Sequence, residues 1–161
     1  MGRDVTQFEM LKKLELSYQH FRTIKAYADE VGILFFSTPD EEDSADFLDE
    51  IGVPLFKIGS GEVTNLPFLE HVGKKHKPII LSTGGSTLIE VEQAVRVIEG
   101  TGNKDLMLLH CVSSYPAEPE DCNLKAMETL RTVFQCPVGF SDHTLGVEIP
   151  VAAVALSLIH I

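Results

Sequence analysis

Residues that can do chemistry follow five short apolar runs of the sequence, at the point where each run ends. The runs cover residues 33–37, 55–59, 78–82, 106–111 and 137–141, and the polar stretches that close or follow them read STP, GSGE, STGG, HCVSSYP and SDHT. In parallel α/β folds the carboxyl ends of the strands form the active-site face. We therefore expect the polar residues at these ends to gather into one site.

Lys57 lies inside the apolar stretch LFKIGSGE and is a candidate for binding an anion. An ammonium group is costly to bury without a partner, and lysine is almost never fully buried unpaired. A carboxylate such as Glu62 would make Lys57 a structural residue. Alternatively, Lys57 holds an anionic ligand, helped by backbone N–H groups around Gly59, Ser60 and Gly61, which can cradle phosphate or carboxylate. We favour the anionic ligand.

Hydroxyl groups mark two further turns. Ser82 begins the STGG turn, whose glycines let the backbone approach a ligand closely, although a plain turn has a similar composition. Ser113 and Tyr115 follow the next apolar run, where their hydroxyls suit either a polyol ligand or the capping of a loop. Both alternatives stay open for each turn.

His143 lies two residues after Ser141 and is a candidate metal ligand. A lone histidine is more often structural, so both interpretations stay open. A catalytic metal needs more ligands than this one, and His160 lies in an apolar tail without polar support. His110 and Cys111 are adjacent on an expected strand and point to opposite faces, which argues against a Cys–His dyad and favours a packed histidine.

The apolar runs lack polar alternation, which is typical of strands buried on both faces of a parallel sheet. Thr87 and Glu90 fit a capping box, and the acidic run 40–43 fits the solvated face of a helix. Between the runs, apolar residues recur at helical spacing in three stretches, residues 21–31, 88–98 and 124–134. The sequence predicts repeated βα units of an α/β fold.

The composition argues against several classes of protein. The 161 residues have room for one ordinary domain, and the net charge of −11 argues against a nucleic-acid partner. No apolar run approaches the roughly 20 residues of a membrane helix, and the N-terminus lacks the apolar stretch of a secretory signal. The 3 cysteines form no Cys-x-x-Cys pair and fit reduced thiols. We expect a cytoplasmic protein without a membrane partner.

Most of the chain resembles the N-acetylneuraminate (sialic acid) synthase family. The matching stretches keep that family's order and spacing from about residue 14 to residue 156. They read GILFFSTP, VPLFKIGSGEVTNLPFLEHV, KPIILSTGGSTLIEVEQAV, LLHCVSSYPAEPEDCNL, VGFSDHTLG and PVAAVAL.

The resemblance implies a fold and an activity. The family's catalytic domain is a (β/α)₈ barrel that condenses phosphoenolpyruvate with N-acetylmannosamine to N-acetylneuraminate and phosphate. Relatives use diacetamido sugars to make pseudaminic or legionaminic acid. The five runs look like strands three to seven, which implies an α/β fold, an incomplete TIM barrel of about five βα units over residues 1–161. We expect strands one, two and eight and the family's C-terminal antifreeze-like domain to be absent, and activity to be weak or lost. The alternatives are a pseudaminic or legionaminic acid synthase that acts on a diacetamido sugar and a noncatalytic anion-binding fragment.

The resemblance also assigns roles to residues of this sequence. Phosphoenolpyruvate-binding positions of the family are matched by Lys57, Ser60, Ser82 and Ser141. Glu62 and Tyr115 match positions near the sugar and would be catalytic. Thr38 and Ser113 also match positions at or near the sugar, and Ser113 stands where some members carry Asn. His143 is a further catalytic position and matches one of the two histidines with which the family binds a divalent metal, Mn²⁺ or Mg²⁺. His160 lies before the position of the second metal-binding histidine and does not match it. Full-length relatives are commonly homodimers.

Overall fold

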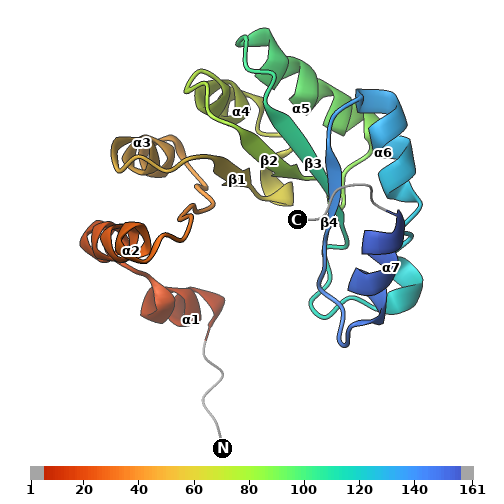
Figure 1. The fold of residues 1–161 in the computed structure, drawn as a ribbon, viewed down its shortest axis with the longest axis horizontal. Coiled ribbons are helices and arrows are strands. Elements are labelled where there is room, and N and C mark those ends of the chain that lie inside the picture. The colour runs from red at the N-terminus through yellow and green to blue at the C-terminus, as the bar shows by residue number, and fades with distance from the viewer. Residues whose placement is uncertain (1–5, 157–161) are drawn as a thin grey trace, which may run out of the picture. The chain divides into compact units, whose positions relative to one another are not determined.

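A computed structural model of the chain describes residues 6–156 and divides the chain into two compact units, Met1–Phe35 and Phe36–Ile161. Figure 1 follows the chain from red to blue through both units. The predicted site residues all lie in the second unit, so any functional site that they form belongs to this unit. His160 lies outside the described residues.

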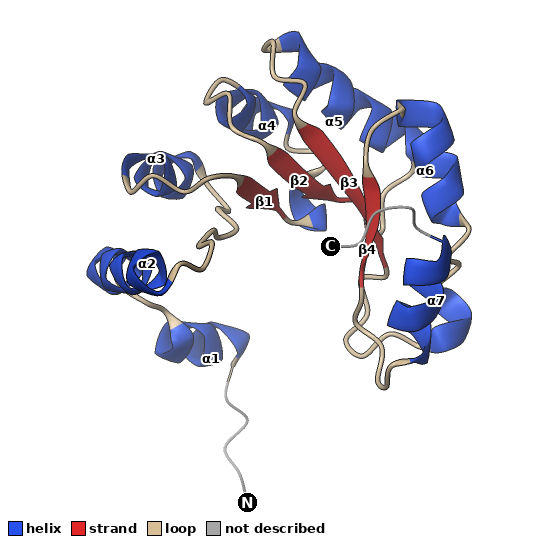
Figure 2. Cartoon of the chain, in the orientation of Figure 1, coloured by secondary structure: helices blue, strands red, loops and turns tan. Residues whose placement is uncertain are grey.

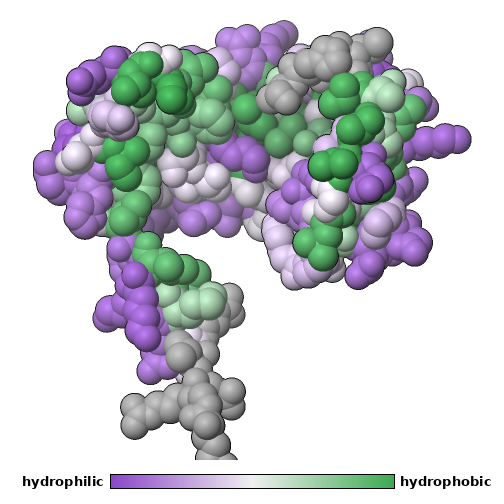
Figure 3. Space-filling view, turned by 60° about the horizontal axis from the view of Figure 1, so that its bottom comes forward, coloured by the Kyte–Doolittle hydropathy of each residue, from purple (hydrophilic) through white to green (hydrophobic). Residues whose placement is uncertain are grey.

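The first unit consists of two amphipathic helices, α1 (Gln7–Leu14) and α2 (Tyr18–Val31). Capping boxes begin both helices, with Thr6 and Ser17 as the N-cap residues. Helix α2 ends at Gly32, whose φ of 75° favours glycine because a side chain there is strained. Helix α1 has one hydrophilic and one hydrophobic side, as its purple and green atoms show in Figure 3.

The second unit alternates short strands with helices, as the βα pattern predicts (Figure 2). In chain order its elements are α3 (Glu42–Glu50), β1 (Phe56–Ile58), η1 (Ser60–Glu62), α4 (Leu66–Gly73), β2 (Ile79–Ser82), α5 (Leu88–Gly100), β3 (Leu106–Cys111), η2 (Pro119–Asp121), α6 (Ala126–Phe134), β4 (Val138–Ser141) and α7 (Glu148–Leu156).

The strands form one parallel sheet in the order β1-β2-β3-β4. Each strand therefore neighbours the next one in the chain, with a helical connection between them. This is the arrangement of consecutive βα units in a barrel wall. The α/β class and the incomplete barrel predicted from sequence are confirmed, with four strands among residues 6–156 in place of the five expected.

The prediction of a strand over residues 33–37 is wrong. This apolar run is irregular in the structure, and it spans the boundary between the two units. Within the second unit, Ser37 still accepts a backbone hydrogen bond from Lys57 N–H, at 3.4 Å. One contact of this length does not make a ladder, because a strand needs repeated pairing with its neighbour.

The two faces of the sheet differ in burial. Helices α4, α5 and α6 cover one face in Figure 1, and the side chains beneath them are at most 6% exposed: Phe56, Ile58, Ile79, Leu81, Leu106 and Leu108. The alternate residues Lys57, Ile80, Met107 and Leu109 point to the other face and are half-buried. We call this second face the inner face, because it corresponds to the interior of a barrel.

Local signals in the sequence place the helices that support this sheet. Thr87 and Glu90 form the predicted capping box of α5, and the hydrogen bonds from Thr87 lower the pKa of Glu90. The acidic run leads into α3, whose Asp46 pairs with His71 at 2.6 Å and with Lys75, both from the α4 region. These bonds lower the pKa of Asp46. The last residues of the acidic run 40–43 thus form the start of helix α3, as predicted, and Asp46 in the same helix links α3 to α4.

Among residues 6–156, no helix is both long enough and apolar enough to cross a membrane.

Candidate functional site

Lys57 extends from β1 on the inner face and donates to two oxygens. Its Nζ lies 2.7 Å from Ser82 Oγ on the neighbouring strand and 3.0 Å from the carbonyl oxygen of Ile58. Both groups are uncharged, and partial burial lowers the pKa of Lys57. Because Ser82 accepts from the ammonium, its own proton is free to point toward a ligand.

Glu62 is not the partner of Lys57. Its Oε2 accepts a hydrogen bond from Asn65 Nδ2 at 2.7 Å. Among the described residues no carboxylate lies within ion-pair distance of the Lys57 ammonium. The structural alternative weighed from the sequence is therefore wrong, and the charge of Lys57 remains available to an anion.

Ser60 is the first residue of η1, which follows β1, and its side chain contacts the turn after β2 and the end of β3. Its Oγ accepts from the backbone N–H of Gly84 at 2.9 Å and lies 3.2 Å from Cys111 Sγ at the end of β3. The Lys57–Ser82 contact and the contacts of Ser60 with Gly84 and Cys111 thus all lie at the carboxyl ends of β1, β2 and β3.

Gly84 allows these segments to approach one another. A Cβ at this position would lie 2.5 Å from Ser113 Oγ, 2.7 Å from Cys111 Sγ and 3.1 Å from the carbonyl oxygen of Cys111. Such distances are shorter than van der Waals contact, and the carbonyl cannot rotate away. Close approach of backbone is thus the reason for glycine in the STGG turn, and it brings Ser113 to the same place.

Tyr115, Ser141 and His143 form a second group, beyond the ends of β3 and β4. The backbone N–H of Ala117 donates to the carbonyl oxygen of His143 at 2.9 Å, which holds the two loops together. The rings of Tyr115 and His143 lie 4.2 Å apart between centroids. Ser141 Oγ lies 3.5 Å from His143 Nε2. Cys111 and Ser141 are register partners, so this group adjoins the first one.

The donor set around His143 does not by itself fit a metal ion. The neighbouring carboxylate, Asp142, accepts from the backbone N–H and the hydroxyl of Thr144, at 3.0 and 2.8 Å. Among residues 6–156 no cluster of three His, Cys, Asp or Glu side chains could hold a metal. One imidazole is too few ligands for a bound divalent cation, so the prediction of a metal at His143 stays a prediction.

Thr38 and Asp40 lie on the segment that precedes α3. Thr38 Cγ2 is 4.0 Å from the Cβ position of Gly59, which places this exposed residue beside the start of η1. Burial and the nearby charge of Glu62 raise the pKa of Asp40. Asp40 was assigned no chemistry from the sequence, because it begins an acidic run that is typical of a solvated helix.

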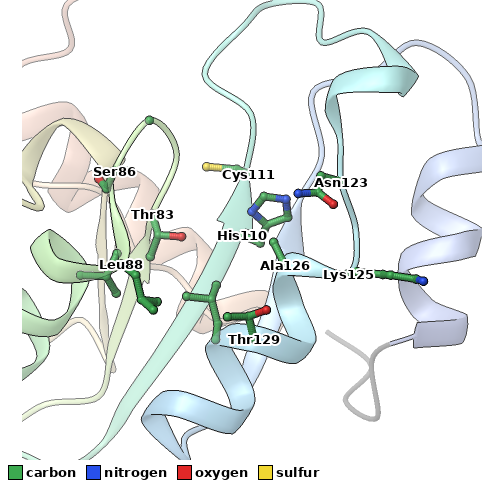
Figure 4. A pocket seen from close by; sticks show the side chains of 12 residues that line it. Thr83, Ser86, Leu88, His110, Cys111, Asn123, Lys125, Ala126 and Thr129 are labelled. Carbon is green, nitrogen blue, oxygen red and sulfur yellow. The ribbon is translucent and has the colours of Figure 1, made fainter.

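A separate cavity of about 350 Å³ lies on the helix-covered side, between α5 and α6 (Figure 4). His110 lines it, and its Nε2 lies 2.7 Å from the carbonyl oxygen of Cys122. In Figure 4 the sulfur of Cys111 points away from the His110 ring. This orientation agrees with the prediction that the two adjacent residues point to opposite faces and do not form a Cys–His dyad.

The fold and the inner-face residues define a partial (β/α) barrel with an ammonium and hydroxyl groups at its carboxyl ends. The model of the NeuB family matches residues 1–159. The chain belongs to the NeuB family, which confirms the resemblance inferred from the sequence.

Relatives and solved structures agree with this membership. The chain is 49% identical to N,N'-diacetyllegionaminic acid synthase of Legionella pneumophila over 155 residues, which cover 94% of this chain and 44% of that protein. It is 38% identical to N-acetylneuraminate-9-phosphate synthase of Homo sapiens over 152 residues, covering 94% of this chain and 42% of that protein. The crystal structure of N-acetylneuraminic acid (sialic acid) synthetase from Leptospira borgpetersenii, in complex with citrate, superposes with a TM-score of 0.86 at 39% identity, over 89% of this chain and 50% of that one.

The chain spans about half the length, or less, of these relatives. It matches proteins that make sialic or legionaminic acids, so its relatives are sugar-acid synthases.

Proposed function

We propose that this chain provides the phosphoenolpyruvate-binding part of a NeuB-type synthase, which condenses phosphoenolpyruvate with an N-acetylated amino sugar. The observation that carries the proposal is the Lys57 ammonium, 2.7 Å from Ser82 Oγ and without a carboxylate partner among the described residues. A half-buried cation that lacks an anion in the protein is suited to bind one from solution.

The proposed reaction forms one carbon–carbon bond and releases phosphate. C3 of phosphoenolpyruvate attacks the aldehyde carbon of the open-chain sugar, and the aldehyde oxygen takes up a proton. Water then adds at C2, and the C2–O bond to phosphate breaks to give the 2-keto acid and inorganic phosphate. The ammonium of Lys57 and the hydroxyls of Ser60, Ser82 and Ser141 would hold the phosphate and carboxylate groups and so fix C3 for attack.

Glu62 and Tyr115 are proposed to act on the sugar, together with Thr38 and Ser113. Ser113 lies against Gly84, and Tyr115 is 75% exposed beside His143. Their hydroxyls can accept and donate to a polyol chain. No step is assigned to a metal ion, because the described residues offer His143 alone.

Sequence identity favours a diacetamido sugar as the acceptor. The chain is 49% identical to a diacetyllegionaminic acid synthase, against 39% to a sialic acid synthetase. N-acetylmannosamine, implied by the resemblance noted in the sequence, is the second candidate acceptor.

A cytoplasmic location and a homodimer are part of the same proposal. The 3 unpaired cysteines support a reducing compartment.

The proposal is tested in two stages with this chain. Isothermal titration with phosphoenolpyruvate alone measures binding, and the absence of binding would contradict the proposed function. Phosphate release is then measured with phosphoenolpyruvate, Mn²⁺ and either 2,4-diacetamido sugar or N-acetylmannosamine. We expect binding of phosphoenolpyruvate and weak turnover that is faster with the diacetamido sugar. Binding without any turnover would favour the noncatalytic anion-binding alternative.

A further inference from the structure

Cys111 contacts the proposed anion site but has no role in the function proposed above. The residue is 7% exposed, and its sulfur lies 3.2 Å from Ser60 Oγ. The same oxygen accepts from the backbone N–H of Gly84 at 2.9 Å. Cys111 thus touches Ser60, a proposed phosphoenolpyruvate ligand, and either of the two groups could donate the hydrogen bond between them.

A count of protons separates the two possible directions. A serine hydroxyl has one proton to donate and two positions that accept, and Gly84 N–H occupies one acceptor position. If Ser60 donates to the sulfur, no proton is left for a ligand. If the thiol of Cys111 donates to Ser60 Oγ, both acceptor positions are filled and the serine proton is left for an anion.

A bound anion favours the second direction. Phosphate and carboxylate oxygens only accept, and a hydrogen bond to a charged acceptor is roughly twice as strong as one between neutral groups. Thiol sulfur is a weak acceptor, so a serine proton is better used on the anion. The ammonium of Lys57, which donates to the neighbouring Ser82, would bring the anion to this place.

We propose that Cys111 is a positioning residue: its thiol donates to Ser60 Oγ and thereby directs the Ser60 proton toward the anionic substrate. This inference rests on the proposed function, because it needs an anion at Lys57 and Ser60. The competing explanation is that Cys111 only fills space, which is plausible because the turn at Gly84 packs tightly against it.

The test is a double-mutant cycle on the affinity for phosphoenolpyruvate, measured by isothermal titration with the full chain. Cys111→Ala removes the donor, Cys111→Ser keeps one, and Cys111→Val fills the space of the thiol without a donor. Each change is made in the wild-type chain and in Ser60→Ala. Cys122→Ala is the matched control, because it removes another buried thiol that does not touch Ser60. Urea unfolding of each variant shows which of them fold.

We expect Cys111→Ala and Cys111→Val to weaken binding about fivefold, the usual effect of one lost hydrogen bond, and Cys111→Ser to stay within about twofold of wild type. In Ser60→Ala the changes at Cys111 should have no further effect. Either foldable variant, Ala or Val, suffices for the cycle.

Three results would overturn the role of Cys111: unchanged affinity in Cys111→Ala or Cys111→Val, a loss in Cys111→Ser as large as in Cys111→Ala, or an effect that persists in Ser60→Ala. The last result is the signature of packing. Failure of the wild-type chain to bind phosphoenolpyruvate is a different outcome, which overturns the proposed function itself.

Discussion

At the scale of single residues, Lys57 decides whether the inner face binds anions. Its neighbours Ser82 Oγ and Ile58 O are uncharged, so the ammonium is only partly compensated. Partial burial strengthens its attraction to an incoming anion, because the low local dielectric acts on both charges. The same burial makes the charged form unfavourable in the empty protein, which connects binding to stability.

Lys57→Met is expected to weaken phosphoenolpyruvate binding by roughly tenfold or more, since it removes a charge-assisted hydrogen bond. The unfolding free energy should not fall, because the variant replaces a partly desolvated charge with an apolar side chain. Titration calorimetry and urea unfolding measure the two effects. Lys104→Met, at an exposed lysine, is the control and should change neither. Wild-type affinity in Lys57→Met would contradict the assignment.

The lowered pKa of Lys57 predicts a dependence of stability on pH. Between the folded pKa and the ordinary value of 10.5, the unfolded chain binds more protons than the folded chain at this residue. The contribution of Lys57 to the unfolding free energy therefore rises with pH across that window. Urea unfolding at several alkaline pH values should show this rise in the wild type relative to Lys57→Met. Parallel curves for the two proteins would contradict it.

Gly84 gives a third prediction for a single residue. Gly84→Ala should destabilise the chain by about 1–3 kcal/mol, because the new methyl group would lie too close to the side chains of Ser113 and Cys111 and within 3.1 Å of the carbonyl oxygen of Cys111. Gly61→Ala is a matched control, since a Cβ there meets no atom within 4 Å and the backbone has no positive φ. Urea unfolding compares the two. Equal midpoints would show that the turn can relax without cost.

At the scale of elements, α5 must begin correctly for the STGG turn to reach the site. The helix starts four residues after Gly84, and its first turn is closed by the capping box of Thr87 and Glu90. The hydroxyl of Thr87 accepts from the backbone N–H of Glu90, an otherwise unsatisfied donor. The cap therefore fixes the direction in which the chain leaves the site.

Thr87→Ala is expected to lower the unfolding free energy by about 1 kcal/mol, the usual cost of losing an N-cap side chain. Thr64→Ala, at an exposed threonine outside a helix, is the control and should have little effect. Thermal unfolding measures both. Frayed amide protons in the first turn of α5, seen by hydrogen exchange, would link the loss to the cap, and uniform exchange would argue against that link.

At the scale of the whole molecule, the parallel sheet has two edge strands, β1 and β4. Within the described residues, each of them pairs with a neighbouring strand on one side only. Parallel sheets are normally covered or closed, because an open edge presents unpaired backbone groups to other chains. Apolar side chains are also exposed on and before α7, among them Leu145, Val147 and Val151. These features are expected to promote self-association of this chain.

We expect association that increases with protein concentration, measured by sedimentation velocity. Val151→Lys should reduce association if the surface of α7 takes part, whereas Glu118→Lys, at an exposed loop position, should not reduce it to the same extent. A monomer at every concentration would show that these edges and surfaces are protected in solution.

Much of the fold follows from local patterns in the sequence. Four of the five apolar runs are strands, the stretches of helical spacing are α2, α5 and α6, and Thr87 does cap α5. The polar residues at the strand ends do gather, because parallel strands bring their carboxyl ends to one edge. The run 33–37 fails as a strand because strand formation needs a partner, which an apolar run alone does not supply.

Local sequence patterns are enough to predict the class of fold, the helix starts and the residue types at the strand ends, because these depend on neighbours within a few positions. The tertiary structure decided which of these residues touch. Lys57 meets Ser82, 25 residues away, in place of the nearby Glu62, and Ser60 meets Cys111, 51 residues away. Such contacts depend on strand register and on the close approach at Gly84, and neither can be read from local spacing.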